Sequence, residues 1–415
     1  MKRGKFFLSL NSRLIFSFCW CCLVIILLLP SAFANVFNLT MTVEGVTKQF
    51  GYSKFEDVLS AVKLNQISNN FPGYSGTGSV GINLDFRGLP MSLSYASGST
   101  DLVLSVPLMG INKTFSGTSR DATNDQFKDW LKKDGQATLN DILKKMAELS
   151  PYDPVAGNPT SLMGGMVTAD FNRGFNPSSS TTTAGGAKDT SNLFGIGLQY
   201  GLYKASGLNA SNYTLPLSYT IRFASDPRKQ LIFDIPLNYL KVEDAKSYNV
   251  GISASFKFPV IDNWILTPSM GTGVAGSVDM ASVGQIVSGS MTSSYTWDLQ
   301  KVHLNLGNML GYYQTIKIKI AGYESNPKLS NTVFRNGFMV SIPHKISTWD
   351  SESEIFVVDT RFFGDKLYLE QYNEFGFSLG SVKSRADLIR YLRGGFTYLF
   401  SSKTKGYVFN VGYSF

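Results

Sequence analysis

Alternation of apolar and small polar residues is the dominant pattern in the C-terminal half of the chain. In residues 213–223, Tyr, Leu, Ile or Phe occupies every second position, and Thr, Pro, Ser or Arg fills the positions between. Residues 248–258 and 407–415 repeat the pattern, with a second face rich in Gly, Ser and Asn. Because successive side chains of a strand point to opposite faces, each segment predicts a strand with one apolar face.

Twelve such segments, separated by turns, follow one another from residue 193 to the end of the sequence. Their approximate ranges are 193–203, 212–223, 230–241, 246–258, 263–273, 286–298, 301–320, 330–342, 353–363, 370–380, 389–400 and 405–415. Strands cross lipid only in a closed barrel, where every backbone group is paired. A soluble β-sandwich also has alternating strands, but Gly, Ser, Thr and Asn replace the Lys and Glu of a solvated sheet face here. We predict an antiparallel transmembrane β-barrel of about twelve strands, or roughly twelve to sixteen, over residues 193–415.

The region before the barrel has mixed patterns. Apolar residues at helical spacing predict a helix over 54–66. Three alternating segments predict strands over 80–86, 91–95 and 102–108. This region therefore has both helices and strands.

Further helices are predicted around Phe127 and Trp130, and from a capping-box pattern at Thr138–Asp141. We predict an α+β region over residues 35–175. Four roles stay open for it: a plug inside the barrel, a periplasmic domain, a surface domain, or additional strands. Residues 176–192, rich in Ser, Thr and Gly, predict a flexible linker to the barrel.

Residues 1–34 have the layout of a secretory signal peptide. Four basic residues precede an apolar run over 14–29, and Ala32-Phe33-Ala34 has the small residues of a cleavage site. The run is shorter than the roughly 20 residues that a retained membrane helix needs. We expect the mature chain to start at Asn35. All three cysteines precede that position, so the mature chain has no disulfide or thiolate chemistry.

Charged residues are few and nearly balanced. They make up 16% of the chain, against roughly 25% in ordinary soluble domains. Without the four basic residues of the signal, 34 basic and 30 acidic residues are left. No basic run is interleaved with aromatic residues, so nucleic acid is not an expected partner.

The final segment resembles the C-terminal strand of bacterial outer-membrane β-barrel proteins. Residues 407–415 read Tyr-Val-Phe-Asn-Val-Gly-Tyr-Ser-Phe and end on an aromatic residue, as those strands do. The resemblance implies an assembly signal formed by Phe415, Tyr413 and Tyr407, which the barrel-assembly machinery recognises. It also implies periplasmic chaperones as partners and a location in the outer membrane, among its lipids and lipopolysaccharide. About twelve strands would be similar to autotransporter translocators and to small-solute channels.

Candidate chemistry is sparse. The two histidines, His303 and His344, are not surrounded by a recognisable nucleophile or metal motif. Gly195, Gly197 and Gly201 alternate within a predicted strand, which indicates small residues of the lumen and not a phosphate loop. We predict no cofactor, no metal and no enzymatic activity, and an outer-membrane enzyme is the least favoured function.

Charges on the polar faces are predicted to line the lumen, because Arg or Lys facing lipid near the midplane costs about 2–4 kcal/mol. The candidates are Arg222, Lys257, Arg335, Arg393, Asp234 and Glu374. Four basic against two acidic groups would attract anions weakly, unless the charges pair to brace the wall.

Two functional hypotheses follow. The polar lumen favours a channel or transporter for small polar or anionic solutes. The order of a domain, a linker and a barrel favours an autotransporter-like anchor that displays or translocates the N-terminal region.

Overall fold

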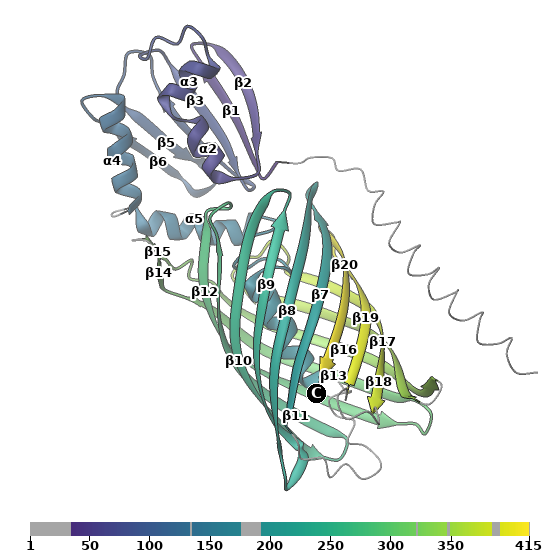
Figure 1. Ribbon diagram of the computed structural model, residues 1–415. Helices are drawn as coiled ribbons and strands as arrows, with labels where there is room; N and C mark the ends of the chain where they lie inside the picture. Colours follow the sequence, from purple (N-terminus) through teal and green to yellow (C-terminus); the bar gives the residue numbers. More distant parts are fainter. Residues whose placement is uncertain are drawn as a thin grey trace, which may run out of the picture. The chain divides into compact units, whose positions relative to one another are not determined.

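Twelve antiparallel strands close into a barrel in the described part of the chain (Figure 1). The computed structural model describes residues 35–132, 135–175, 192–320, 323–346, 349–383 and 391–414. The barrel strands are β7 (Leu193–Ala205), β8 (Leu208–Phe223), β9 (Asp226–Val242), β10 (Ala245–Ile261), β11 (Trp264–Ser277), β12 (Ser282–Asp298), β13 (His303–Ile316), β16 (Ser330–Ile346), β17 (Trp349–Gly364), β18 (Gln371–Lys383), β19 (Tyr391–Phe400) and β20 (Thr404–Ser414). Each pairs with the next, and β20 pairs with β7 to close the ring. The predicted fold class is confirmed.

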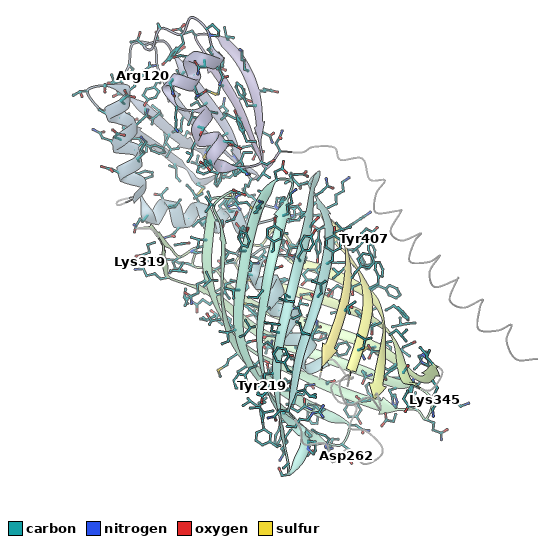
Figure 2. All side chains as sticks on the ribbon, viewed as in Figure 1. Arg120, Tyr219, Asp262, Lys319, Lys345 and Tyr407 are labelled. Atoms are coloured by element: carbon teal, nitrogen blue, oxygen red, sulfur yellow. The ribbon has the colours of Figure 1, made fainter. Side chains whose placement is uncertain are left out.

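The two faces of the wall follow the sequence pattern. In β10, Tyr248, Val250 and Ile252 are 60%, 47% and 54% exposed, whereas Ser247 and Asn249, on either side of Tyr248, are buried. Figure 2 shows Tyr219 and Tyr407 on the outside of the wall, in agreement with their exposure. The outer surface is therefore apolar, as a lipid-facing wall requires. No helix in the described residues has the length and hydropathy to cross a membrane.

The ends of the barrel differ in the length of their connections. We call the end where β7 begins and β20 ends the terminal rim, and the opposite end the distal rim. Connections at the terminal rim are residues 224–225, 262–263, 299–302, 347–348 and 384–390. Connections at the distal rim are residues 206–207, 243–244, 278–281, 317–329, 365–370 and 401–403, and the longest includes the hairpin of β14 (Ile318–Ile320) and β15 (Tyr323–Ser325). Counted between the ends of the described strands, the chain thus has 30 connecting residues at the distal rim and 17 at the terminal rim.

The N-terminal domain is built on a six-stranded antiparallel sheet of order β2-β1-β3-β4-β5-β6. Its elements are β1 (Phe37–Val43), β2 (Val46–Tyr52), α2 (Phe55–Ala61), α3 (Leu64–Asn70), β3 (Val80–Phe86), β4 (Leu89–Tyr95), β5 (Leu102–Val106), η2 (Pro107–Met109), β6 (Ile111–Phe115), α4 (Arg120–Lys132) and α5 (Gln136–Leu149). One face of the sheet packs against helices: the Phe37 and Phe55 rings are 5.8 Å apart, and those of Phe115 and Phe127 are 5.3 Å apart.

Two helix predictions need correction. The helix expected over 54–66 is two helices, because Lys63 is extended and separates α2 from α3. The third helix does not start at the capping box of Thr138. It starts at Gln136, after Gly135, whose side chain position is closed by the Trp130 ring 2.8 Å from where a Cβ would lie. The Gly135 N–H donates to the Trp130 carbonyl at 2.7 Å immediately before this helix.

Helix α6 (Leu162–Phe175) was not expected from the sequence. It lies inside the barrel, against β10, β11, β12, β13 and β16 (Figure 1). The predicted signal peptide 1–34, residues 176–191 of the predicted linker, and Phe415 lie outside the described residues.

Candidate functional site

Among the described residues, one chain segment occupies the lumen. Residues 150–175, which we call the plug, consist of an irregular stretch followed by α6. Only Gly165 and Asn172 of these residues are exposed. A peptide segment can be buried this completely only if the barrel wall is complementary to it in shape and in hydrogen bonding.

The plug enters the barrel at the distal rim. There the Tyr368 N–H donates to the Ala147 carbonyl, 2.8 Å, and the Leu369 N–H donates to the Gly157 carbonyl, 2.9 Å. The Tyr152 hydroxyl donates to the carbonyl of Leu208, at the start of β8, 3.3 Å. All three barrel residues belong to distal-rim connections or to the adjoining strand end. The chain thus reaches the lumen from the end opposite to Leu193.

A buried aspartate organises this entry. The Asp153 carboxylate accepts a bond from Arg87, 3.0 Å, and one from the Ser282 hydroxyl, 3.4 Å. Its second oxygen accepts the backbone N–H groups of Val155 and Ala156 at 2.9 and 3.2 Å. Because Arg87 lies in the turn between β3 and β4, this carboxylate connects the N-terminal domain, the plug and the wall.

Glycines in the wall provide the space for the apolar side chains of the plug. A Cβ on Gly273 would lie 2.7 Å from Leu162, and one on Gly284 would lie 2.7 Å from Val155. A Cβ is essentially never found that close to another atom. Gly273 and Gly284 are therefore positions where the shape of the wall matches the plug, and they are different from Gly195, Gly197 and Gly201, the lumenal glycines predicted from the sequence.

The same relation holds at the end of α6. A Cβ on Gly307 would collide with the Phe175 ring, and one on Gly337 would lie 2.8 Å from Phe171 and 2.9 Å from Phe175. The two phenylalanine rings are 4.8 Å apart and fill this part of the lumen together.

An ionic cluster fixes α6 to two sides of the wall. Arg173 pairs with Asp170 in the same helix and with Asp234 of β9, the latter at 3.1 Å. Asp170 also accepts the hydroxyls of Tyr313, 2.7 Å, and Ser290, 3.1 Å. A buried carboxylate needs such partners, because its desolvation costs several kcal/mol.

A second cation of the wall contacts the plug. The Arg335 guanidinium pairs with Glu374 at 2.6 Å and donates to the Thr360 hydroxyl at 2.6 Å. It also lies 5.1 Å from the centre of the Phe171 ring, a cation–π arrangement. Arg335, Glu374 and Asp234, all candidates from the sequence, therefore belong to the plug's surroundings.

The other three candidates lie nearer the terminal rim. Arg222 and Lys257 are in register with Gln230 between them, and both are buried. Arg393 pairs with Glu354 on β17, which also accepts the Ser378 hydroxyl. In the closed ring, β17 is opposite β9, so the Arg222 and Lys257 side faces the Glu354 side across the lumen.

Several charged residues of this site were missed from the sequence: Asp170, Arg173, Glu352 and Glu354. Glu352 and Glu354 are buried two residues apart on one face of β17, so the alternation of that strand was the available signal. With these residues included, the named lumenal charges are five basic and five acidic. The positive excess inferred from the sequence is not found among them, because acidic partners on neighbouring strands and on α6 neutralise it.

The histidines lie at strand ends. His303 Nδ1 is 2.5 Å from the Asp298 carboxylate, and His344 Nδ1 is 2.9 Å from the Ile342 carbonyl. Neither hydrogen-bonds to a Ser or Thr side chain in the described part of the chain. Within the same residues, no group of three His, Cys, Asp or Glu side chains could hold a metal.

The terminal strand completes the ring. Tyr413 pairs through its backbone with Ile196 of β7 and Leu392 of β19. Tyr407 is 47% exposed on the outer face, with its ring 5.2 Å from that of Tyr398. Both residues belong to β20, the strand for which the sequence resemblance implies an assembly signal.

No protein-family model matches the chain, and no curated protein matches its sequence. Solved structures that are similar to it include the β-domain of the Bordetella autotransporter BrkA, 10% identical over 54% of this chain and 98% of that chain, with a TM-score of 0.41. The translocator domain of the autotransporter NalP from Neisseria meningitidis is 10% identical over 62% and 99%, with a TM-score of 0.42. The NanC porin is 14% identical over 53% and 98%, with a TM-score of 0.36. Each of them is covered almost completely by about half of this chain, and the closed twelve-strand barrel is the fold that the resemblance to outer-membrane β-barrel proteins implied.

Proposed function

We propose that this protein is an outer-membrane anchor whose barrel presents the N-terminal domain at the cell surface. The plug stays in the lumen permanently and attaches the domain to the barrel. The direction of the chain carries the proposal. The plug enters at the distal rim, where Ala147 bonds to Tyr368, whereas the first barrel strand begins with Leu193 at the terminal rim. The N-terminal domain and the start of the barrel are therefore assigned to opposite sides of the membrane.

The lengths of the connections support the side chosen for the domain. Outer-membrane barrels have short periplasmic turns and longer extracellular loops. The distal rim has 30 connecting residues and the terminal rim 17, which supports an extracellular distal rim. Insertion by the barrel-assembly machinery after escort by periplasmic chaperones, and contact with lipids and lipopolysaccharide, are parts of the same proposal.

The filled lumen supports an anchor over an open solute channel. A solute pathway needs continuous water, but Phe171 and Phe175 pack against wall glycines in the lumen. The ionic partners of Asp170 and Arg173 hold the helix in place. A channel role would require the plug to leave this position, at the cost of exposing those groups.

Cysteine labelling on intact cells tests the assignment, because all three cysteines of the sequence precede Asn35. Single cysteines are introduced at Gln126 in α4, at Asp244 in a distal-rim turn, and at Asp262 in a terminal-rim turn. Asp244 and Asp262 are 71% and 93% exposed, so accessibility depends only on the side of the membrane. We expect a membrane-impermeant maleimide to label the first two on intact cells and the third only after lysis.

The opposite labelling would place the N-terminal domain in the periplasm and overturn the proposal. A companion measurement addresses the channel. Full-length protein in planar bilayers is expected to give no stable pores, and steady ion-conducting openings would favour the channel hypothesis instead.

A further inference from the structure

In the described part of the chain, no helix packs on the second face of the N-terminal sheet, and this face is almost free of charge. Cross-strand pairing places its side chains in rows. One row, which we call the amide row, runs across all six strands and comprises Gln49, Thr40, Asn83, Ser92, Ser105 and Asn112. The neighbouring row, which we call the hydroxyl row, comprises Thr47, Thr42, Gly81, Ser94, Val103 and Thr114.

The side chains of the amide row have unused hydrogen-bonding capacity. Among the described residues, none of these six side chains forms a hydrogen bond with another side chain or with the backbone. Each Asn, Gln, Ser or Thr side chain offers both a donor and an acceptor. Strands lie about 4.8 Å apart, so the row extends for about 24 Å.

Charged side chains occur elsewhere in the domain, so the scarcity of charge is a property of this face and not of the whole domain. Lys48 and Lys113 belong to the edge strands β2 and β6, where lysine commonly protects a sheet from pairing. Both point to the helix side, over the rings of Phe71 and Trp130 at 5.2 and 5.1 Å. The face itself has two carboxylates at its borders. Asp85 accepts the Gly88 N–H of its own turn at 2.6 Å, and Asp101 lines the edge of the hollow that the hydroxyl row forms.

The small residues of the hydroxyl row create a hollow in the face. It has a volume of about 590 Å³. Its lining includes Thr42, Gly81, Ser94 and Thr114 from the row, and Ser99 at its margin.

The margin of the hollow is held in place by a buried arginine, Arg120, labelled in Figure 2. Its guanidinium donates to the carbonyls of Ser99 and Ala96, both at 3.0 Å, and to that of Thr77 at 2.9 Å. It also donates to the Tyr74 hydroxyl at 2.6 Å. Five donors in a fixed fork order these loop carbonyls before any ligand arrives, which lowers the cost of binding.

We propose that this face binds an uncharged polysaccharide along the amide row, with one or two sugar units in the hollow. Sugar hydroxyls are donors and acceptors at once, which matches Asn, Gln, Ser and Thr. A charged polymer or nucleic acid would need ionic partners, which the two rows lack. A protein partner would need an apolar interface core, and Val103 is the only large apolar side chain in either row.

Binding of neutral polymers to the full-length protein in nanodiscs tests the proposal. The probes are dextran, mannan and a linear β-glucan, with dextran sulfate as the charged counterpart of dextran. We expect at least one neutral polymer to bind and dextran sulfate to bind no better. Asn83→Lys, at the centre of the amide row, should raise the Kd by about tenfold or more, and so should Ser94→Tyr, which fills the hollow.

The matched control is Gln126→Lys, which adds the same charge on exposed helix α4 and should leave the Kd within about twofold. Three results would overturn the inference: no neutral polymer binds, the face variants bind as well as the unmodified chain, or the face proves to be a dimer interface that Asn83→Lys dissociates in sedimentation. The proposal depends on the N-terminal domain alone, so it can fail while cysteine labelling still supports the anchor, and the reverse.

Discussion

Arg173 of the plug helix and Asp234 of strand β9 form an ion pair of 3.1 Å across the boundary between plug and wall, with side chains only 7% and 16% exposed. Asp170 shares the same arginine and is bound from the other side by Tyr313 and Ser290. One cation therefore neutralises two buried carboxylates that belong to different parts of the fold. The position of α6 depends on this arrangement as well as on its apolar packing.

Removing that cation should loosen the plug. In an Arg173→Met variant, Asp170 and Asp234 are left buried without their common partner, and breaking a buried pair in this way costs about 3–5 kcal/mol. We expect faster hydrogen exchange in residues 162–175 and intermittent pores in bilayers, while the heat-modifiable mobility of the barrel on gels persists. Arg361→Met is the control, because Arg361 is 54% exposed in its pair with Asp359, and exposed pairs contribute about 0–1 kcal/mol. Unchanged exchange in α6 would contradict the role given to Arg173.

The wall glycines that contact the plug allow a steric test of the same question. Gly307→Ala places a methyl group where the Phe175 ring lies, so the end of α6 must move. Gly289→Ala is the matched control in β12, because a Cβ there meets nothing within 4 Å. We expect increased exchange of α6 and raised conductance only in the first variant. Equal behaviour of the two variants would show that the wall does not select the plug by shape.

Deletion of residues 35–175 should open the lumen and leave the barrel closed, because all barrel strands begin at or after Leu193. The named wall charges that remain are four basic and four acidic, so we expect weak ion selectivity. Arg222→Gln and Arg393→Gln each remove one positive charge from the lumen, and the second also leaves Glu354 without its partner, so both variants should shift selectivity toward cations. Reversal potentials in asymmetric salt measure both effects. A strongly anion-selective pore would contradict the balance of four basic and four acidic groups and would support the net positive lumen expected from the sequence.

The barrel was predictable because each strand has one face toward lipid and one toward a polar lumen, so apolar and small polar residues alternate. All twelve expected segments overlap observed strands, from β7 to β20. The long segment expected over 301–320 ends as a barrel strand at Ile316, where the chain leaves the wall to form β14. The alternation within each strand is sufficient to predict both that the segment is a strand and which of its faces contacts lipid.

Helix α6 was not predictable by the same means. A helix enclosed by a barrel has no solvent face, so residues such as Met163, Val167 and Phe171 are buried together with Asp170 and Arg173, and no polar stripe marks the helix. Three glycines in α6 lower its helix propensity further. The ion pairs of the lumen join residues tens of positions apart, and alternation alone cannot identify such partners. By contrast, β1 alternates clearly, with Phe37, Leu39 and Met41 buried, so its sequence pattern was sufficient to predict this strand, which was missed from the sequence.

The terminal strand should act in assembly more than in stability. Backbone pairing of β20 with both of its neighbours extends as far as Tyr413 and Ser414, whereas recognition by the assembly machinery is expected to depend on Phe415. We predict that Phe415→Ser lowers the amount of folded protein in the outer membrane and raises degradation, yet leaves refolding of purified protein in detergent nearly unchanged. Phe363→Ser, which removes another aromatic that is 53% exposed on the outer wall, is the control and should be assembled normally. Quantitative immunoblots of membrane fractions, paired with gel-shift refolding assays, separate the two effects. Equal membrane levels for both variants would remove Phe415 from the signal, and a refolding defect in Phe415→Ser would assign its role to stability.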